Sequence, residues 1–249
     1  MSFDDTFARV ERSDWLRNQF RSLVDGELPA EVEPFSFVPL AGMRELSIAL
    51  DLHADDMLVD LGCGRGGPGM WLARHTGAVL TGVDGSAVAV MQAADRAGQF
   101  GLAERSRFVV GDLADTGLPA ASADGVVCVD AFMFAADVVA CAREVHRLLR
   151  PGRHFVLTTW LPCQPGDPRL PDRYRDLDVA HALTTAGFTA VDVRHRPGWE
   201  AGHRAVYEGA LNAGDPGGDE GLAMIQQAAQ DLLSWIDRLI RVMVVARRP

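Results

Sequence analysis

Short apolar runs alternate with amphipathic segments through the middle of the chain. The runs predict strands at residues 57–61, 79–83, 108–110, 125–129 and 155–159, and the amphipathic segments predict helices near residues 69–75, 87–100 and 137–149. Strand and helix repeated with short links build a mostly parallel sheet that helices cover on both faces. The pattern therefore predicts the α/β class.

The regions on either side of this pattern are less regular. Residues 3–24 carry a helical stripe of apolar groups, residues 25–39 form an acidic, proline-containing loop, and residues 42–52 form a second helix. After the fifth strand the sequence predicts a loop at 161–173, a helix at 176–186, a strand at 189–194, a segment near 199–211, a turn-rich stretch at 212–219 and a last strand at 242–246. Apolar positions from Leu222 to Leu239 predict one amphipathic helix that faces its own core, with a lid or a dimer interface as the alternative.

We expect one domain over residues 1–249. Its parts are an N-terminal cap (1–40), a core (41–195), a helical insertion (196–239) and the last strand (240–249). The segment from Phe35 to Pro39 precedes the first core helix, and its aromatic residues predict that the N-terminal part closes over a ligand.

Composition narrows the class of function. Of 249 residues, 48% are hydrophobic and 23% are charged, which is typical of a globular protein. The 34 acidic and 24 basic residues give a formal net charge of -10, which argues against a nucleic-acid partner. All the basic residues are arginines, so Schiff-base chemistry on lysine and a phosphate loop ending in Gly-Lys are excluded.

The cysteines and the apolar segments bear on the cell compartment. Cys63, Cys128, Cys141 and Cys163 have neither the spacing of a zinc site nor that of a disulfide framework, which indicates reduced thiols. The acidic N-terminus does not resemble a signal peptide, and the sequence has no apolar run long enough to span a membrane. We expect a cytoplasmic protein without a membrane partner or a metal, either monomeric or homodimeric.

A glycine-rich turn follows the first predicted strand. Gly62, Gly64 and Gly66 let the backbone turn sharply and come close to a ligand. The same segment also fits the dinucleotide pattern GxGxxG, so a nicotinamide cofactor is one alternative. Asp60 argues against it, because a carboxylate there would repel a pyrophosphate but suits a ligand with an ammonium group.

Two further aspartates end the next two strands. Asp84, in the run with Gly85 and Ser86, can accept hydrogen bonds from both hydroxyls of a ribose. Asp112 can accept from the amino group of an adenine. Singly, each is more often a strand-end cap or a solvated acid, but the three carboxylates together indicate a nucleoside site at the carboxyl ends of the strands.

The run from Leu58 to Trp160 resembles the class I S-adenosylmethionine-dependent methyltransferases, especially the ubiquinone/menaquinone-biosynthesis-like group that includes many bacterial natural-product enzymes. Four motifs carry the resemblance: residues 59–66, residues 83–84, residues 111–112 and residues 123–130. The resemblance implies a Rossmann-like, seven-stranded sheet with an antiparallel last strand. It also implies S-adenosyl-L-methionine as the cofactor and S-adenosyl-L-homocysteine as the product.

The resemblance further assigns the cofactor contacts. Asp60 and the glycines at 62, 64 and 66 would hold the methionine part, and the run of Asp84, Gly85 and Ser86 the ribose. The adenine would contact Asp112 and Leu113, and the sulfonium would lie near Asp130 and Ala131. Arg65 stands where the family often has a small hydroxyl residue, and the Asn-Pro-Pro-Tyr motif used on amide or base nitrogens is missing.

The methyl acceptor would meet the more variable parts of the chain. The expected substrate contacts are Phe132, Phe134, Trp160, Trp199, His203 and Tyr207. The catalytic candidates are His203, as a base, and Trp160, which can pack on an apolar substrate at the end of a central strand. Core packing for the phenylalanines and a surface position for His203 and His195 are the structural alternatives.

Three functions remain open at this level. The first is methyl transfer to an amine, hydroxyl or activated carbon of an apolar small metabolite in secondary metabolism. The second is a methyltransferase-like protein that binds the cofactor without transferring the methyl group, as a cyclase or a regulatory module. The third is a NAD(P)-dependent oxidoreductase, which Asp60 and the lack of lysine disfavour.

Overall fold

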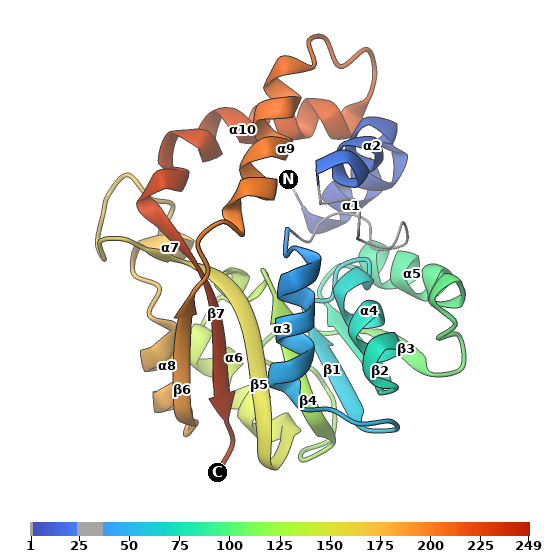
Figure 1. Cartoon of the computed structure of the whole chain (residues 1–249), viewed down its shortest axis with the longest axis vertical. Coiled ribbons are helices and arrows are strands. Elements are labelled where there is room, and N and C mark those ends of the chain that lie inside the picture. Colours follow the sequence, from blue (N-terminus) through green and yellow to red (C-terminus); the bar gives the residue numbers. More distant parts are fainter. Residues whose placement is uncertain (1, 24–36) are drawn as a thin grey trace.

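A computed structural model describes residues 2–23 and 37–249, and these build a seven-stranded sheet in the order β3-β2-β1-β4-β5-β7-β6 (Figure 1). The strands are β1 (Met57–Leu61), β2 (Val79–Asp84), β3 (Ser106–Val110), β4 (Ala123–Val129), β5 (Leu149–Pro162), β6 (Thr189–His195) and β7 (Leu239–Arg247). The first five pair in parallel, whereas β7 runs antiparallel to β5 and β6. The predicted fold class is confirmed, including the antiparallel last strand.

Helices cover both faces of the sheet because the central strands alternate between two apolar cores. Val126 and Cys128 of β4 join one core, and Val127 and Val129 join the other. This period of two places successive side chains on opposite faces. One face is covered by α3 (Leu40–Leu50), α4 (Gly67–Thr76) and α5 (Ala87–Arg96), and the other by α6 (Val138–Leu148) and α8 (Val179–Thr185).

Two boundaries differ from the sequence prediction around the fifth strand. The predicted loop at 161–173 is wrong at its start, because β5 continues to Pro162 through pairing with Leu239 of β7. At its end lies the short helix α7 (Asp172–Arg175).

The predicted helix at 87–100 ends early, at Arg96, and the chain continues as the 3-10 turn η1 (Ala97–Phe100).

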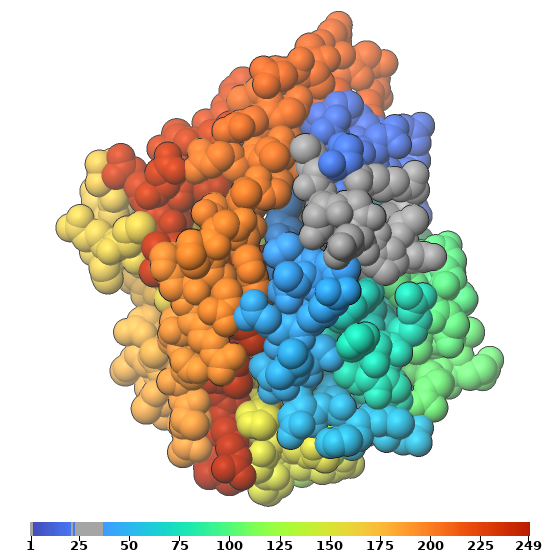
Figure 2. Space-filling model, in the orientation of Figure 1, coloured from blue at the N-terminus to red at the C-terminus, as the bar shows by residue number. Residues whose placement is uncertain are grey.

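Four helices form a cap over the carboxyl ends of the parallel strands: α1 (Phe3–Arg12), α2 (Asp14–Leu23), α9 (Glu200–Asn212) and α10 (Glu220–Trp235). In Figure 2 the dark blue atoms of α1 and α2 and the orange atoms of α9 and α10 make the upper part of the molecule. The cap has its own apolar core, which includes Val10, Leu16, Val206 and Ile225.

The predicted N-terminal helix is two helices that break at Ser13. The Ser13 hydroxyl donates to Asp219 and accepts from the Leu16 backbone N–H, as an N-cap residue does. Asp219 is also the N-cap of α10, so this one carboxylate connects the start of α2 to the start of α10. Most of the predicted loop at 25–39 lies outside the described residues, and so do Phe35 and Ser36.

The apolar stripe from Leu222 to Leu239 is divided among three elements. Leu222 and Ile225 face the cap core from α10, in agreement with a helix packed on its own protein. The prediction of one helix to residue 239 is wrong, because Ile236 lies in the 3-10 turn η3 (Ile236–Arg238) and Leu239 opens β7. Within the described residues we find no helix that could cross a membrane.

Candidate active site

The glycine-rich turn connects β1 to α4 at the carboxyl edge of the sheet. The backbone amides of Gly62 and Cys63 both donate to the Val83 carbonyl, at 2.8 and 3.0 Å, which folds the turn back over β2. Gly62 has a φ of 71°, and a Cβ at this position would lie 2.3 Å from the Cβ of Ala131. Glycine is therefore required here by both conformation and space, and the close approach brings the segment after β4 onto the turn.

Asp60 lies beneath this turn and is 1% exposed. Its Oδ2 atom has no hydrogen-bond partner among the described residues. Burial and the nearby Asp84 carboxylate raise the pKa of Asp60 to about 7. A buried carboxyl oxygen without a partner is costly unless a ligand satisfies it, and a cationic group would satisfy both its hydrogen bonding and its charge.

Asp84 ends β2 and fixes the loops on either side of it. Its two carboxylate oxygens accept from the backbone amides of Gly64 and Ser86, each at 2.8 Å. Burial nevertheless raises the pKa of this carboxyl. Each oxygen has a second lone pair, so the carboxylate can still accept from a pair of hydroxyls.

The third aspartate, Asp112, differs from Asp60 and Asp84 in its exposure to solvent. Asp112 is exposed, and its carboxylate accepts from the Ala114 backbone N–H at 2.8 Å in a tight turn after β3. The adjacent Leu113 comes closer to the glycine turn, because one of its methyl groups lies 3.5 Å from the position of a Cβ on Gly62. The structure thus brings Leu113, more than the Asp112 carboxylate, to the turn.

Helix α1 covers part of this edge. Asp4 accepts from the Ser86 hydroxyl, and a Cβ at Gly64 would lie 3.2 Å from the Phe7 ring. Gln92 of α5 donates to Glu11 at 2.7 Å. The described part of the N-terminal segment therefore contacts α5 and also the turn and Ser86, which are expected to hold the cofactor.

Asp130 follows β4 in the left-handed region, with a φ of 56°. It pairs with Arg241 of β7 through both terminal guanidinium nitrogens, with Nη2 at 2.6 Å from Oδ2, and accepts from the Thr158 hydroxyl at 2.7 Å. Sequence reasoning placed Asp130 near the cofactor but missed Arg241. The signal for it was an arginine flanked by apolar residues in the last strand, between Ile240 and Val242.

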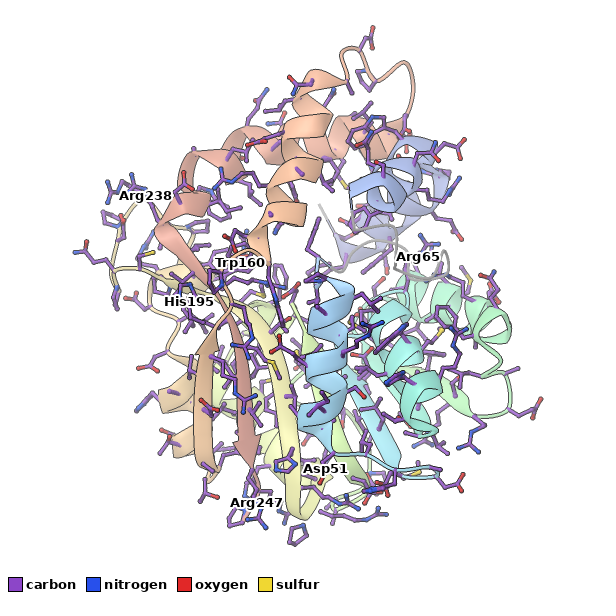
Figure 3. The ribbon with its side chains drawn as sticks, viewed as in Figure 1. Asp51, Arg65, Trp160, His195, Arg238 and Arg247 are labelled. Carbon is purple, nitrogen blue, oxygen red and sulfur yellow. The ribbon has the colours of Figure 1, made fainter. Side chains whose placement is uncertain are left out.

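Aromatic rings from three elements surround His203. Its ring stacks on Phe37 at a centroid distance of 3.9 Å, lies 5.4 Å from Trp160 of β5 and 4.9 Å from Tyr207. Burial and the Arg241 charge lower the pKa of His203 to about 3. Three of the predicted acceptor-side residues thus form one cluster where the sheet meets the cap, as the position of Trp160 in Figure 3 shows.

The other predicted acceptor-side residues are dispersed. Trp199 packs over Gly42 of α3, with ring carbons 2.7 and 2.9 Å from the position of a Cβ there. Phe132 is fully buried beside Phe155 in the core, which is its packing alternative. His195 is exposed at the end of β6.

Phe134 lines an open hollow beside the 3-10 turn η2 (Phe132–Phe134). The hollow has a volume of about 670 Å³ and lies between this turn and α7. The Phe134 ring is 46% exposed, meets Phe3 of α1 edge-on at 5.3 Å and lies 5.6 Å from the guanidinium of Arg173. Phe134 therefore presents a partly exposed ring at the edge of this hollow.

Comparison with known proteins agrees with these features. Residues 59–157 match the family described as "Methyltransferase domain". The sterol 24-C-methyltransferase of Eremothecium gossypii is 29% identical over 124 residues, which are 50% of this chain and 33% of that protein. The methyltransferase GfsG of Streptomyces halstedii is 35% identical over 132 residues, which are 52% of this chain and 46% of that protein. The chain thus matches less than half of either relative.

Among solved structures, the (4+2)-cyclase SpnF superposes with a TM-score of 0.73 at 22% identity. The alignment covers 95% of this chain and 93% of SpnF. At this identity the likeness establishes a shared fold.

Proposed function

We propose that the protein transfers a methyl group from S-adenosyl-L-methionine to an amine, hydroxyl or activated carbon of an apolar small molecule, and the match of residues 59–157 to a methyltransferase domain supports this. The observation that carries the proposal is the buried Asp60 carboxyl beneath the glycine turn, whose Oδ2 has no hydrogen-bond partner in the described part of the chain. It is suited to the α-ammonium group of the cofactor's methionine part.

The remaining groups at this edge fit the same cofactor. Asp84 offers two acceptor oxygens to the ribose hydroxyls, and Leu113 offers an apolar surface to the adenine. Gly62 and Ala131 bring the segment after β4 next to the methionine part. When bound, the cofactor supplies an electrophilic methyl group on a sulfonium.

On the acceptor side, the residues of the chain orient the substrate and exclude water. Alignment of nucleophile and methyl group alone can contribute several kcal/mol, about 7–11 kcal/mol at the limit. Trp160 and Tyr207 supply buried ring surface. His203 is neutral at neutral pH, as a proton acceptor must be, but its lowered pKa makes it a weak base. This favours acceptors that need little deprotonation.

The named relatives, the net charge and the free cysteines support a proposal for the metabolic role and the cell compartment of the protein. The relatives include an enzyme named for a sterol and a Streptomyces methyltransferase, and we place this protein likewise in the modification of apolar metabolites, in bacterial natural-product biosynthesis. A net charge of -10 and the free cysteines Cys63, Cys128, Cys141 and Cys163 support a cytoplasmic enzyme that acts on small molecules and not on nucleic acids.

Calorimetric titration with S-adenosyl-L-methionine, NAD and NADP tests the cofactor. We expect S-adenosyl-L-methionine to bind with a sub-millimolar Kd and neither nicotinamide cofactor to bind, because a pyrophosphate at the turn would face the Asp60 carboxyl. Binding of NAD or NADP alone would make the turn a pyrophosphate site and refute the methyltransferase proposal.

A cofactor-binding protein that transfers no methyl group is the second candidate. The likeness to SpnF, which is named as a cyclase, favours it at the level of fold only. The two candidates differ in product: only methyl transfer releases S-adenosyl-L-homocysteine in proportion to substrate consumed. Mass spectrometry of both products with a panel of apolar substrates separates them.

Cofactor affinity should also depend on pH through Asp60. Its pKa is raised to about 7 in the free protein, and an ammonium group favours the carboxylate, so binding should release a proton. Affinity should therefore rise from pH 5.5 and level off above about pH 7, with a slope approaching tenfold per pH unit at the acidic end. Asp60→Asn should bind more weakly with a flat profile over this range. A sloping profile in Asp60→Asn would assign the effect to another group.

A further inference from the structure

Arg241 is a buried cation whose Nε atom makes no hydrogen bond within the described residues. The residue is 1% exposed on β7, where it pairs directly with Trp160 of β5, so both side chains project from the same face of the sheet. The guanidinium carbon lies 5.0 Å from the centre of the indole ring. Asp130 binds the two terminal nitrogens, whereas Nε has no hydrogen-bond partner in the described part of the chain.

His203 brings a second unused nitrogen to the same indole. Its ring lies 5.4 Å from Trp160, and its buried Nδ1 atom also lacks a partner among residues 2–23 and 37–249. A buried polar group without a hydrogen bond costs about 1–3 kcal/mol. Two such groups on one aromatic ring point to a ligand that satisfies both.

We propose that the methyl acceptor is an uncharged apolar molecule whose carbonyl or hydroxyl oxygen accepts a hydrogen bond from Arg241 Nε, with His203 Nδ1 as the second polar contact. The proposal deepens the proposed function and rests on it for the identity of the site. A carbonyl oxygen has two lone pairs and can accept from Arg241 Nε and from His203 Nδ1 when Nδ1 carries the imidazole proton, whereas a hydroxyl can accept from Nε and donate to an unprotonated Nδ1.

The charges around the cluster favour an uncharged ligand. Asp130 and Arg241 neutralise each other, and the pKa of His203, lowered to about 3, leaves its imidazole neutral. A carboxylate or phosphate would thus meet no uncompensated cation in the cluster, and an ammonium would face an N–H donor. In the hollow beside η2, Arg173 is outnumbered by three acids, Asp137, Asp172 and Asp176, which also disfavours an anion there.

The cluster also adjoins the expected cofactor position. Asp130 holds Arg241, and the next residue, Ala131, lies against Gly62 of the glycine turn. A series of contacts through Trp160, Asp130 and Ala131 therefore runs from Arg241 Nε and His203 Nδ1 to the expected position of the cofactor's methionine part.

Four ligands with one carbon skeleton test the proposal: 1-tetralone, tetralin, 1-aminotetralin and tetralin-1-carboxylate. Each is titrated calorimetrically into protein saturated with S-adenosyl-L-homocysteine. We expect the ketone to bind about tenfold more tightly than tetralin, the value of one hydrogen bond to a charged donor, and more tightly than either charged ligand. The carbonyl stretch of bound tetralone should shift to lower wavenumber.

Two variants locate the contact. Arg241→Lys keeps a cation for Asp130 but removes the Nε–H, and His203→Phe keeps the ring but removes Nδ1. Both should reduce the preference for the ketone, and Arg241→Lys should also reverse the infrared shift. The matched controls are Arg247→Lys, at the far end of the same strand (Figure 3), and His75→Phe, whose ring stacks on Trp71 at 4.8 Å on α4. Both controls should behave as the unmodified protein.

Equal binding of tetralin and tetralone, tightest binding of a charged ligand, or no binding of any of the four would overturn the proposal. So would a ketone preference that survives both variants. Loss of S-adenosyl-L-homocysteine binding would instead refute the proposed function. The four ligands would then be titrated into the unloaded protein, where the same preferences decide the inference separately.

Discussion

Asp130→Ala is expected to lower the free energy of unfolding by about 3–5 kcal/mol, because it leaves a buried charge without a partner. Arg241 is 1% exposed and is paired with Asp130 through both terminal nitrogens. Alanine would also be strained at a φ of 56°, which asparagine and aspartate tolerate better. Denaturant unfolding followed by tryptophan fluorescence measures the change.

Three control variants show how much of the stability loss in Asp130→Ala comes from leaving a buried charge without a partner. Asp237→Ala removes the partner of Arg204 in a pair whose aspartate side chain is 80% exposed, and should cost at most about 1 kcal/mol. Asp130→Asn should fall between the two alanine variants, because an amide oxygen still accepts hydrogen bonds. Adding Arg241→Met to Asp130→Ala should recover part of the loss, since no buried charge remains. Equal losses in Asp130→Ala and Asp237→Ala would show that the buried pair is no more stabilising than a surface pair.

Asp84→Ala is expected to raise the Kd for S-adenosyl-L-methionine at least a hundredfold. The substitution removes the two oxygens available to the ribose hydroxyls, and hydrogen bonds to charged groups contribute about 1.5–3 kcal/mol each. It also releases the backbone amides of Gly64 and Ser86, which the carboxylate holds at 2.8 Å. Calorimetric titration of protein with an unchanged circular dichroism spectrum gives the value.

The controls for this prediction separate charge from shape. Asp84→Asn keeps one acceptor oxygen and should weaken binding by a smaller factor. Asp95→Ala, at an exposed position on α5, should leave the Kd unchanged. An unchanged Kd in a folded Asp84→Ala variant would show that Asp84 does not bind the ribose. It would thereby refute the nucleoside part of the proposed site.

Helix and strand positions were predictable where the signal is local. The glycine turn, the strand β2 and the helix α6 lie within a few residues of their predicted bounds, because apolar periodicity and turn residues are read from neighbours in the chain. The stripe from Leu222 to Leu239 misled, since its spacing continues through η3 into β7. What ends that helix is the pairing of β7 with β5, which periodicity does not encode.

The N-terminal break has the same origin. A helical stripe runs through residues 3–24, yet the helix divides at Ser13. The Ser13 hydroxyl binds Asp219, and a Cβ on Gly221 would lie 2.4 Å from the Ser13 Cβ. This contact joins residues more than 200 positions apart, so the partner of Ser13 cannot be read from its neighbours in the sequence.

By itself, the sequence determined the α/β class and set the candidate cofactor residues at the carboxyl ends of predicted strands, whereas the antiparallel last strand was expected from the family resemblance. It could do so because Asp60 and Gly62 lie at and just after the end of β1 and Asp84 ends β2, and neighbouring parallel strands bring their carboxyl ends to one edge. Only the tertiary structure brings together the residues that we propose for the acceptor side. Asp130 and Arg241 are 111 residues apart, and they meet because β7 inserts beside β5 and sets Arg241 opposite Trp160. Local propensity fixes where a strand lies in the chain, but the neighbour it pairs with depends on the packing of the whole sheet.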